Sequence, residues 1–526
     1  MATLRAGVEP RPARLALQSA VLQSVVLLLS LALPSFGAAQ QASGTAAGAS
    51  PWVATWGAAM MAADAGRAPD VSGQTLRLIV HASVGGPKAR VWLSNRFGAG
   101  PLHIGAAHLA ICANADGAAG AIRSGSDRAL TFDGLGSVTI PPGATIVSDA
   151  AALDVPPFAD LAVSLYFPDR TLAATVHDGA RQVSYAANGN AAGAPEMPGD
   201  SWTEHSWYVL TGVDVYAPGD AAVVALGDSI TDGNHSTESA NRRWPDDLAV
   251  RLEADASTHA AGVLGVVNAG ISGNRVLLDG TGPNAMARFD ADVLDRSGVR
   301  YLILFEGIND IEDVTHQHQT YGDLDKRLEW ALAQMAQLAH EHGIKVFGAT
   351  QMPDCRRLHC ASVEGEATRQ ALNEWIRTDP IFDGVIDFDR ITRDPAHPSQ
   401  LLPKYDSGDS VHPNDLGYEA MADAIDLSLF TAARINGKPV ATLWHPPFRA
   451  RSDEALHPKA NFVEIDVSNL WANRLIGDSQ PGAKRYAATK IVTYTSNSPL
   501  LPSGLLTRPK VYAVRMLDIR AAAPAK

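Results

Sequence analysis

The tripeptide Gly-Asp-Ser occurs four times in the chain, with copies that begin at Gly199, Gly227, Gly408 and Gly477. Only the copy at Gly227 follows a compact apolar run, Ala221 to Leu226. Such a run is typical of a strand that is buried on both faces of a parallel sheet. The hydroxyl of Ser229 would then lie at the carboxyl end of a strand, where open α/β sheets bind their ligands. Ser229 is therefore the candidate nucleophile.

Three further short motifs lie near predicted strand ends: Asn268 to Asn274, Gly307 to Asp310, and Asp409 to His412. A serine that attacks an ester needs a base to take its proton, a carboxylate to orient the base, and donors to stabilise the oxyanion. In this scheme His412 is the base and Asp409 is the orienting acid. Each motif alone is weak evidence, but the four together predict acyl transfer.

Two residues of these motifs offer uncharged hydrogen-bond donors. Gly273 has no side chain to obstruct its backbone N–H, and Asn309 offers a side-chain N–H. Asparagine is also a common helix cap, so Asn309 by itself would favour that simpler role. Asp228 and Asp310 are expected to hold their loops by accepting hydrogen bonds from backbone N–H groups rather than to catalyse.

The ordered set of Ser229, Gly273, Asn309 and His412 in these local motifs resembles the SGNH hydrolases, also called the GDSL esterase and lipase family. The resemblance covers about residues 217–440 and implies a flavodoxin-like, three-layer α/β/α fold with a parallel sheet. It implies a catalytic triad of Ser229, Asp409 and His412, and an oxyanion hole formed by the Ser229 N–H, Gly273 and Asn309. It implies neither a metal nor a cofactor.

Several residues bear on other chemistries. Ile230 replaces the leucine of the family motif, a swap of similar volume. Thr231 stands where the G-x-S-x-G elbow of ordinary α/β hydrolases has its second glycine, so that motif is not met. The H-x-H pairs point in different directions on a helix, which favours solvated surface over a metal site. These pairs are His316 with His318 and His340 with His342.

The strand and helix pattern predicts the layout of residues 217–440. Strands are expected at 221–226, 263–267, 301–305, 344–349 and 385–388, and helices at 245–252 and 324–342. Residues 51–216 instead contain short strand-like runs, such as 75–81, 89–94 and 161–167, and no long amphipathic helix. This pattern predicts a β-sandwich or jelly roll, and it resembles the β-sandwich that precedes the hydrolase domain in some secreted bacterial SGNH proteins.

The tail, residues 441–526, is expected to be a small β-rich module with strands at 462–467 and 511–517. The segments Leu470 to Asp478 and Pro499 to Leu506 resemble the carboxy-terminal β-sandwich of large glycoside hydrolases of the α-L-rhamnosidase type. That resemblance implies an ester carried on a plant polysaccharide.

The amino terminus predicts export. Arginines precede an apolar stretch and small residues follow it, so residues 1–39 are expected to be a signal peptide, and residues 40–50 have the composition of a linker. The protein is thus expected to be secreted or periplasmic. Export permits disulfides, and Cys355 with Cys360 is the candidate pair, while Cys112 is expected to be a buried apolar residue.

Charge and length limit the partners. The 526 residues carry a formal net charge of −13 and no long basic block, which argues against nucleic acid. The amino-terminal apolar stretch is short and interrupted by polar residues, so no stable membrane insertion is expected. The expected function is a secreted serine esterase that removes short acyl groups from carbohydrate. The alternatives are a lipase or arylesterase on lipid or aryl esters, and a carbohydrate-binding surface protein without catalysis.

Overall fold

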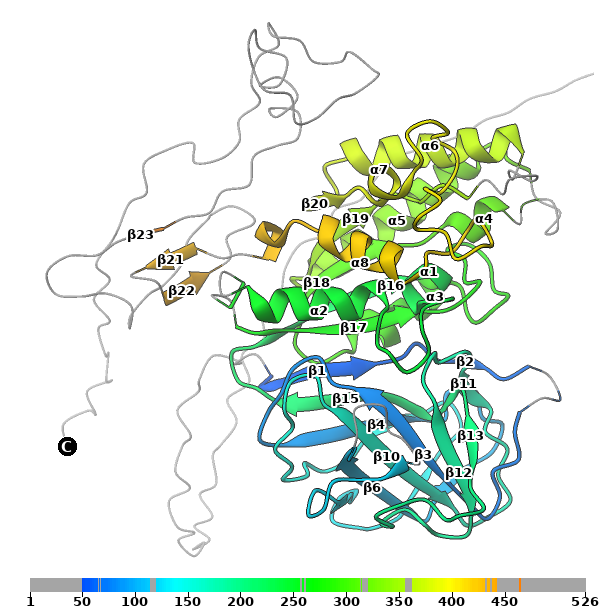
Figure 1. The fold of residues 1–526 in the computed structure, drawn as a ribbon, viewed down its shortest axis with the longest axis vertical. Helices are drawn as coiled ribbons and strands as arrows, with labels where there is room; N and C mark the ends of the chain where they lie inside the picture. Colours follow the sequence, from blue (N-terminus) through cyan, green and yellow to red (C-terminus); the bar gives the residue numbers. More distant parts are fainter. Residues whose placement is uncertain are drawn as a thin grey trace, which may run out of the picture. The chain divides into compact units, whose positions relative to one another are not determined.

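The fold is seen in a computed structural model (Figure 1). It describes residues 50–64, 66, 68–113, 120–255, 258–259, 262–312, 314, 320–354, 362–430, 433–435, 438–441 and 463–464. The predicted signal peptide, most of the predicted linker, the pair Cys355 and Cys360, and His316 with His318 lie outside the described residues. In the part of the chain that is described, no helix has the length and apolar character needed to cross a membrane.

A five-stranded parallel sheet forms the centre of the α/β region, with strand order β17-β16-β18-β19-β20. Its strands are β16 (Ala221–Gly227), β17 (Leu264–Gly270), β18 (Val299–Phe305), β19 (Lys345–Ala349) and β20 (Gly384–Ile386). The chain order 2-1-3-4-5 is the flavodoxin-like order that was predicted. Gly227 pairs with Gly270 on one side and with Phe305 on the other, so three strands end at the same edge.

Helices cover both faces of this sheet because its central strands are apolar on both faces. In β16, Val223 and Ala225 pack with α2 (Trp244–Ala254) and α8 (Asp415–Ala424). Val224 and Leu226 belong to the opposite core, with α3 (Ala285–Phe289), α5 (Leu324–Glu341) and α6 (Val363–Thr378). The remaining helices are α1 (Ser229–Asp232), η2 (Asp290–Leu294), α4 (Ile308–Glu312), α7 (Phe388–Thr392) and η3 (Leu427–Phe430).

Most predicted elements of this region form within a few residues of their expected ends. The strand predicted at 385–388 is wrong at its carboxyl end, because Asp387 accepts a hydrogen bond from the Arg390 N–H and so caps α7, which begins at Phe388. Helices α6 and α8 were not predicted. Their amino termini are capped by Ser362 and Asn414, residues of the type that such caps prefer.

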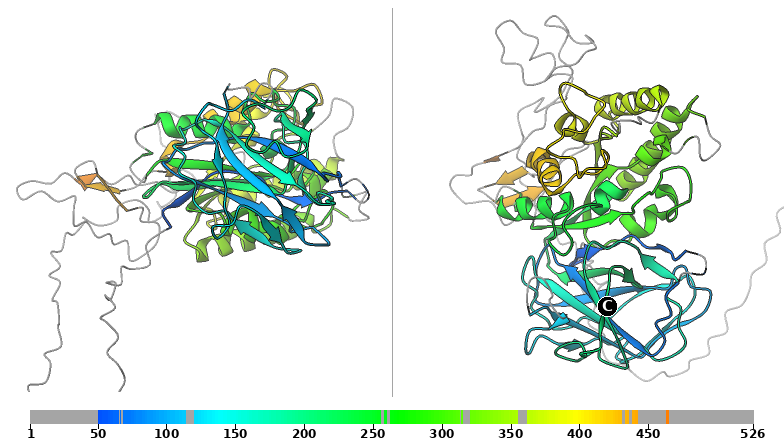
Figure 2. Two further views of the ribbon diagram at one scale, coloured as in Figure 1. Left: turned by 90° about the horizontal axis from the view of Figure 1, so that it is seen from below. Right: turned by 45° about the vertical axis from the view of Figure 1, so that its right-hand side comes forward.

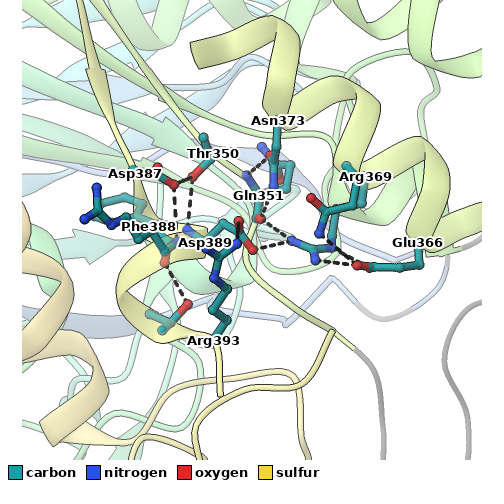
Figure 3. A network of polar contacts seen from close by, with 12 residues as sticks. Thr350, Gln351, Glu366, Arg369, Asn373, Asp387, Phe388, Asp389 and Arg393 are labelled. Atoms are coloured by element: carbon teal, nitrogen blue, oxygen red, sulfur yellow. Dashed lines mark hydrogen bonds and ion pairs between the residues drawn. The ribbon is translucent and has the colours of Figure 1, made fainter. Parts of the chain in front are cut away.

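A network of charged side chains fastens α6 to the loops that follow β19 and β20 (Figure 3). The fully buried Arg369 pairs with Glu366 on its own helix and with Asp389, 2.8 Å away on α7. Asp389 also contacts Arg377 and Arg393, at 2.7 and 3.1 Å. The network contains none of the candidate catalytic residues, so its role is to hold the helices that flank the sheet.

Antiparallel strands build the region from Trp52 to Tyr216, as predicted, and no α-helix occurs among its described residues; Figure 2 shows these strands in blue through cyan to green. The two larger sheets have the orders β1-β15-β4-β9 and β13-β12-β3-β10-β6-β7, and smaller sheets are β14-β11-β2 and β5-β8. The strands are β1 (Trp52–Gly57), β2 (Met61–Ala62), β3 (Gln74–His81), β4 (Ala89–Ser94), β5 (Leu102–Ile104), β6 (Ala106–Ile111), β7 (Arg128–Ala129), β8 (Val138–Ile140), β9 (Thr145–Val147), β10 (Asp160–Phe167), β11 (Thr175–His177), β12 (Ser184–Asn188), β13 (Trp202–Glu204), β14 (Trp207–Tyr208) and β15 (Leu210–Tyr216).

Of the expected tail module, residues 441–526, only 441 and 463–464 lie within the described residues. They belong to the sheet β22-β21-β23, formed by β21 (Ala433–Ile435), β22 (Lys438–Ala441) and β23 (Val463–Glu464), so this sheet begins before the expected start of the module. The strand predicted at 462–467 overlaps β23, and the one predicted at 511–517 lies outside the described residues.

Buried polar bonds join the antiparallel region to the α/β region. The Val266 N–H donates to Ser83 Oγ at 2.9 Å, and the Ala54 N–H donates to the Ser297 carbonyl at 2.9 Å. Ser83 is 6% exposed and Ala54 2%, so these contacts lie in the interior. The strands of the first region are therefore part of the same packed structure as the sheet that carries Ser229.

Candidate active site

The nucleophile turn begins where β16 ends. Gly227 is required there, because a Cβ would lie 2.5 Å from the Phe305 carbonyl oxygen and 2.2 Å from Thr231 Oγ1. Asp228 then caps α1, its Oδ1 accepting from the Ile230 N–H at 2.9 Å. Ser229 is the first residue of α1 and is 7% exposed. The strand therefore delivers the hydroxyl to the carboxyl edge of the sheet, as the sequence predicted.

Ser229, His412 and Asp409 lie in a hydrogen-bonded row. The Ser229 hydroxyl is 2.8 Å from His412 Nε2, and His412 Nδ1 is 2.6 Å from Asp409 Oδ2. Asp409 Oδ1 accepts from the backbone N–H groups of Val411 and His412, at 2.9 and 2.8 Å. Because the carboxylate fixes the proton on Nδ1, Nε2 is free to accept the proton of the serine.

The environment of Asp409 keeps its carboxyl ionised. Partial burial acts to raise its pKa, but the hydrogen bonds from the His412 side chain and from the backbone N–H groups outweigh burial and lower the pKa to about 2. The negative charge can therefore stabilise the imidazolium that forms when His412 takes a proton.

The two predicted oxyanion donors, Gly273 in a loop and Asn309 in α4, belong to segments that contact each other. Gly273 has a φ of +78°, a conformation that favours glycine. The next residue, Asn274, accepts a hydrogen bond on its backbone oxygen from Asn309 Nδ2 at 2.9 Å. Asn309 lies inside α4, and its amide bonds the Asn274 loop rather than capping the helix. One N–H of that amide is thereby oriented, and the other is left for a second acceptor.

Asp228 and Asp310 have the roles that the sequence predicted for them. Asp310 accepts from the backbone N–H groups of Val276 and Leu277, at 2.8 and 3.0 Å, and so fixes the loop that follows Gly273. Burial raises the pKa of Asp310 to about 6 and that of Asp228 to about 7, despite the backbone hydrogen bonds that each accepts.

Sequence reasoning missed Arg288, whose guanidinium lies beneath the site and is almost fully buried. It donates to the carbonyls of Gly227 and Ala269, at 2.9 and 2.7 Å, and to Asn274 Oδ1 at 2.9 Å. It therefore ties the ends of β16 and β17 to the loop of Gly273. The sequence gives no signal for this role, because arginine is mostly a surface residue.

Sequence reasoning also missed His235, which shares Asp409 with the triad. His235 Nε2 lies 3.3 Å from Asp409 Oδ2, and its ring stacks on His412 with 5.4 Å between centroids. His235, Asp409 and His412 have ligand atoms within 4.8 Å of one another. In this arrangement both nitrogens of His412 already have partners, Asp409 Oδ2 for Nδ1 and the Ser229 hydroxyl for Nε2.

Other sequence candidates have different partners. Ser410 has a φ of +67° and its N–H donates to Asp406, so it belongs to the turn before His412 and not to a strand end. His340 and His342 do not converge, since they contact Asp383 and the Leu338 carbonyl respectively. Cys112 is buried and forms no disulfide with any described residue, and burial raises the pKa of its thiol to about 12. It is a buried apolar residue, as predicted.

Comparison with known proteins gives a family for this part of the chain. Residues 225–420 match the GDSL-like Lipase/Acylhydrolase family. Similar solved structures include a GDSL-like lipase from Bacteroides thetaiotaomicron, which is 23% identical over 40% of this chain and 87% of that chain, with a TM-score of 0.29. Another is a carbohydrate acetylesterase from Sinorhizobium meliloti, which is 15% identical over 39% of this chain and 95% of that chain, with a TM-score of 0.30.

One curated relative matches a short segment. It is a candidate beta-glucuronidase from Formosa agariphila, 50% identical over 46 residues, which are 9% of this chain and 4% of the relative. The chain therefore covers only a small part of that relative's length. The match to the GDSL-like Lipase/Acylhydrolase family, in contrast, covers residues 225–420, the part of the chain that contains Ser229, Asp409 and His412.

Proposed function

We propose that the protein is a serine esterase that cleaves carboxylic esters through an acyl-enzyme. The observation that carries the proposal is the contact row of the Ser229 hydroxyl, His412 Nε2 and the Asp409 carboxylate, at 2.8 and 2.6 Å. His412 takes the serine proton while Oγ attacks the ester carbonyl carbon, and it then returns that proton to the departing alcohol. Water, deprotonated by the same histidine, releases the acid and restores Ser229.

The negative charge that forms on the carbonyl oxygen needs donors that are already in place. In the proposal, the backbone N–H groups of Ser229 and Gly273 and the free N–H of the Asn309 amide provide them. The Asn274 carbonyl orients this amide, and Arg288 holds the Asn274 side chain, so little reorganisation is needed during the reaction. All three donors are uncharged.

The proposed substrates are short acyl esters, acetyl above all, on carbohydrate. The support is the resemblance of the tail to a rhamnosidase-type β-sandwich and the short match to a relative named as a sugar-cleaving enzyme. The signal-like amino terminus supports a secreted or periplasmic protein, where plant polysaccharide is accessible. Lipid or aryl esters are the second candidate, because the family description includes lipases.

Hydrolysis of p-nitrophenyl acetate and octanoate tests the proposal. Ser229→Ala should abolish turnover, whereas Ser201→Ala and Ser410→Ala, which alter the serines of two other Gly-Asp-Ser copies, should retain it. A preference for acetate over octanoate, together with acetate release from acetylated xylan or pectin, would favour the carbohydrate proposal over the lipase alternative. If wild type and Ser229→Ala are equally inactive on all of these, the esterase proposal fails and glycan binding without turnover becomes the better explanation.

A further inference from the structure

A buried histidine of the antiparallel region contacts the helix that carries the nucleophile. His177, the last residue of β11, is 3% exposed. Its Nε2 lies 3.0 Å from Oδ1 of Asp232, the last residue of α1, and its Nδ1 lies 2.8 Å from the Ala59 carbonyl oxygen. Asp232 is itself 4% exposed. None of the family motifs includes His177, which precedes Ser229 by 52 residues.

The partners of the ring determine its protonation. A carbonyl oxygen only accepts hydrogen bonds, so Nδ1 carries a proton. Nε2 faces a carboxyl oxygen, so a proton lies between them as well. Oδ2 of Asp232 accepts from both the N–H and the hydroxyl of Ser272, at 3.0 and 2.6 Å, so this oxygen acts only as an acceptor. The favoured state is therefore an imidazolium against a carboxylate.

The Asp232 carboxylate links the helical turn that carries Ser229 to the loop that carries Gly273. Asp232 closes the single helical turn that Ser229 opens, and Ser272 directly precedes Gly273. The helical turn and the Gly273 loop are thus fixed to each other through Asp232, and both are fixed through His177 to β11. The antiparallel region contributes the cation that balances this buried charge.

We propose that His177 is a positioning residue for the proposed esterase reaction: its imidazolium holds Asp232, and through Ser272 the oxyanion loop, in place beside Ser229. This inference rests on the proposed function for its catalytic consequence. It assigns to the antiparallel region a direct part in forming the site, in addition to any part in substrate binding.

Charged groups around the His177 ring set the pH range over which the His177–Asp232 ion pair exists. Burial acts to lower the pKa of His177, but the charge and hydrogen bond of Asp232 and the Ala59 carbonyl together raise it above its ordinary value. Arg243 opposes this rise and is itself paired with Asp246 at 3.1 Å. His81, paired with Asp160, lines one cavity together with His177 and Asp232. Because the folded pKa is raised, the stabilisation is complete below the unfolded value near 6.5 and is lost as the pH rises through the folded value.

Three variants separate the charged role from ordinary packing. His177→Gln removes the imidazolium charge and the two separate ring nitrogens that face Ala59 and Asp232. Asp232→Asn keeps an oxygen for Ser272 and offers an N–H to the Nε2 of a neutral His177, so both contacts persist without charge. His108→Gln is the matched control, since His108 lies on β6 of the same region and pairs with Asp127 at 3.0 Å, away from α1.

On p-nitrophenyl acetate at pH 7, we expect His177→Gln to lower kcat by about 10- to 100-fold, with a smaller effect on KM, because small displacements of catalytic groups cost this much. His108→Gln should retain kcat within about twofold. As the pH rises above 7, kcat of the wild type should fall as His177 loses its proton, whereas kcat of Asp232→Asn should stay flat. The thermal midpoint of the wild type should fall relative to that of Asp232→Asn over the same range.

The outcomes are distinguishable. If kcat of His177→Gln stays within twofold of wild type, or if Asp232→Asn shows the same alkaline fall as wild type, the inference is wrong. If His177→Gln does not fold, the pH profile of Asp232→Asn decides. If the wild type has no esterase activity, the proposed function fails, while the pH dependence of the thermal midpoints still tests the ion pair.

Discussion

Replacing Asp228 by asparagine should stabilise the protein, and more so as the pH rises. The Asp228 side chain is fully buried, and only Oδ1 is used, as acceptor for the Ile230 N–H, while Oδ2 has no hydrogen-bond partner. Burial raises the pKa of the carboxyl from 3.8 to about 7. Asparagine keeps the cap and brings no charge into this site.

The size of the effect follows from proton linkage. Above pH 3.8, ionisation of Asp228 lowers the free energy of the unfolded chain, whereas the folded chain keeps the proton until about pH 7. Each pH unit in this window therefore lowers the free energy of unfolding by about 1.4 kcal/mol. Between pH 5 and pH 8, the free energy of unfolding of Asp228→Asn should rise by about 3 kcal/mol relative to that of the wild type. The effect ends at about pH 7, where the folded wild type also loses the proton.

Urea unfolding of both proteins at pH 5 and pH 8 measures this difference. Asp310→Asn is the comparison variant: both Asp310 oxygens accept backbone N–H groups, so the new amide would direct its own N–H at one of these donors. That variant should be destabilised by about 1 to 3 kcal/mol. Because the pKa of Asp310 is raised only to about 6, its own pH-dependent gain between pH 5 and pH 8 should be about 1.4 kcal/mol, half that of Asp228→Asn. If the stability difference between Asp228→Asn and wild type were the same at the two pH values, Asp228 would be ionised in the fold and the reasoning would be refuted.

Four further outcomes are expected. Asn309→Ala should lower kcat on p-nitrophenyl acetate by about 10²- to 10³-fold, and a loss below tenfold would exclude its oxyanion role. Asp409→Asn should lower kcat by about 10⁴-fold, because an amide cannot hold the required tautomer of the base; a mild loss would mean that another group does so. Gly273→Ala should lower both kcat and the thermal midpoint, because φ is +78° and the new Cβ would meet Thr281 Oγ1 at 3.0 Å; an unchanged midpoint would contradict this. Cys112 should resist iodoacetamide at pH 8 in the folded protein and react in urea, as peptide mass mapping would show; labelling of the folded protein would mean that the thiol is accessible.

Local sequence was sufficient to predict the strands of the parallel sheet and the position of Ser229 at its carboxyl edge. The apolar runs of 221–226 and 301–305 predict strands buried on both faces, and a turn after the first of them places Ser229 at the carboxyl edge. The glycine at 227 fits because a strand end and a helix start meet where no Cβ has room. These features depend on neighbours in sequence, so a linear pattern predicts them.

The ends of short elements were harder to predict. Asp387 looked like part of a strand because it lies among apolar residues, yet its side chain caps α7. Helix α6 was missed, and its buried face is held by Arg369, a residue that the pattern treats as solvent-exposed. A charged side chain can be buried only when its partners come from other elements, and those partners are invisible to a local pattern.

The sequence by itself determined which residue types are available for acyl transfer and the order in which the sheet presents them. Only the tertiary structure decided that Ser229 meets His412, 183 residues away, and that Arg288 ties the strand ends together beneath them. It alone brings His177 against Asp232. The physical reason is that buried charges and hydrogen bonds are satisfied across elements, by atoms whose distance in space is unrelated to their separation in the chain.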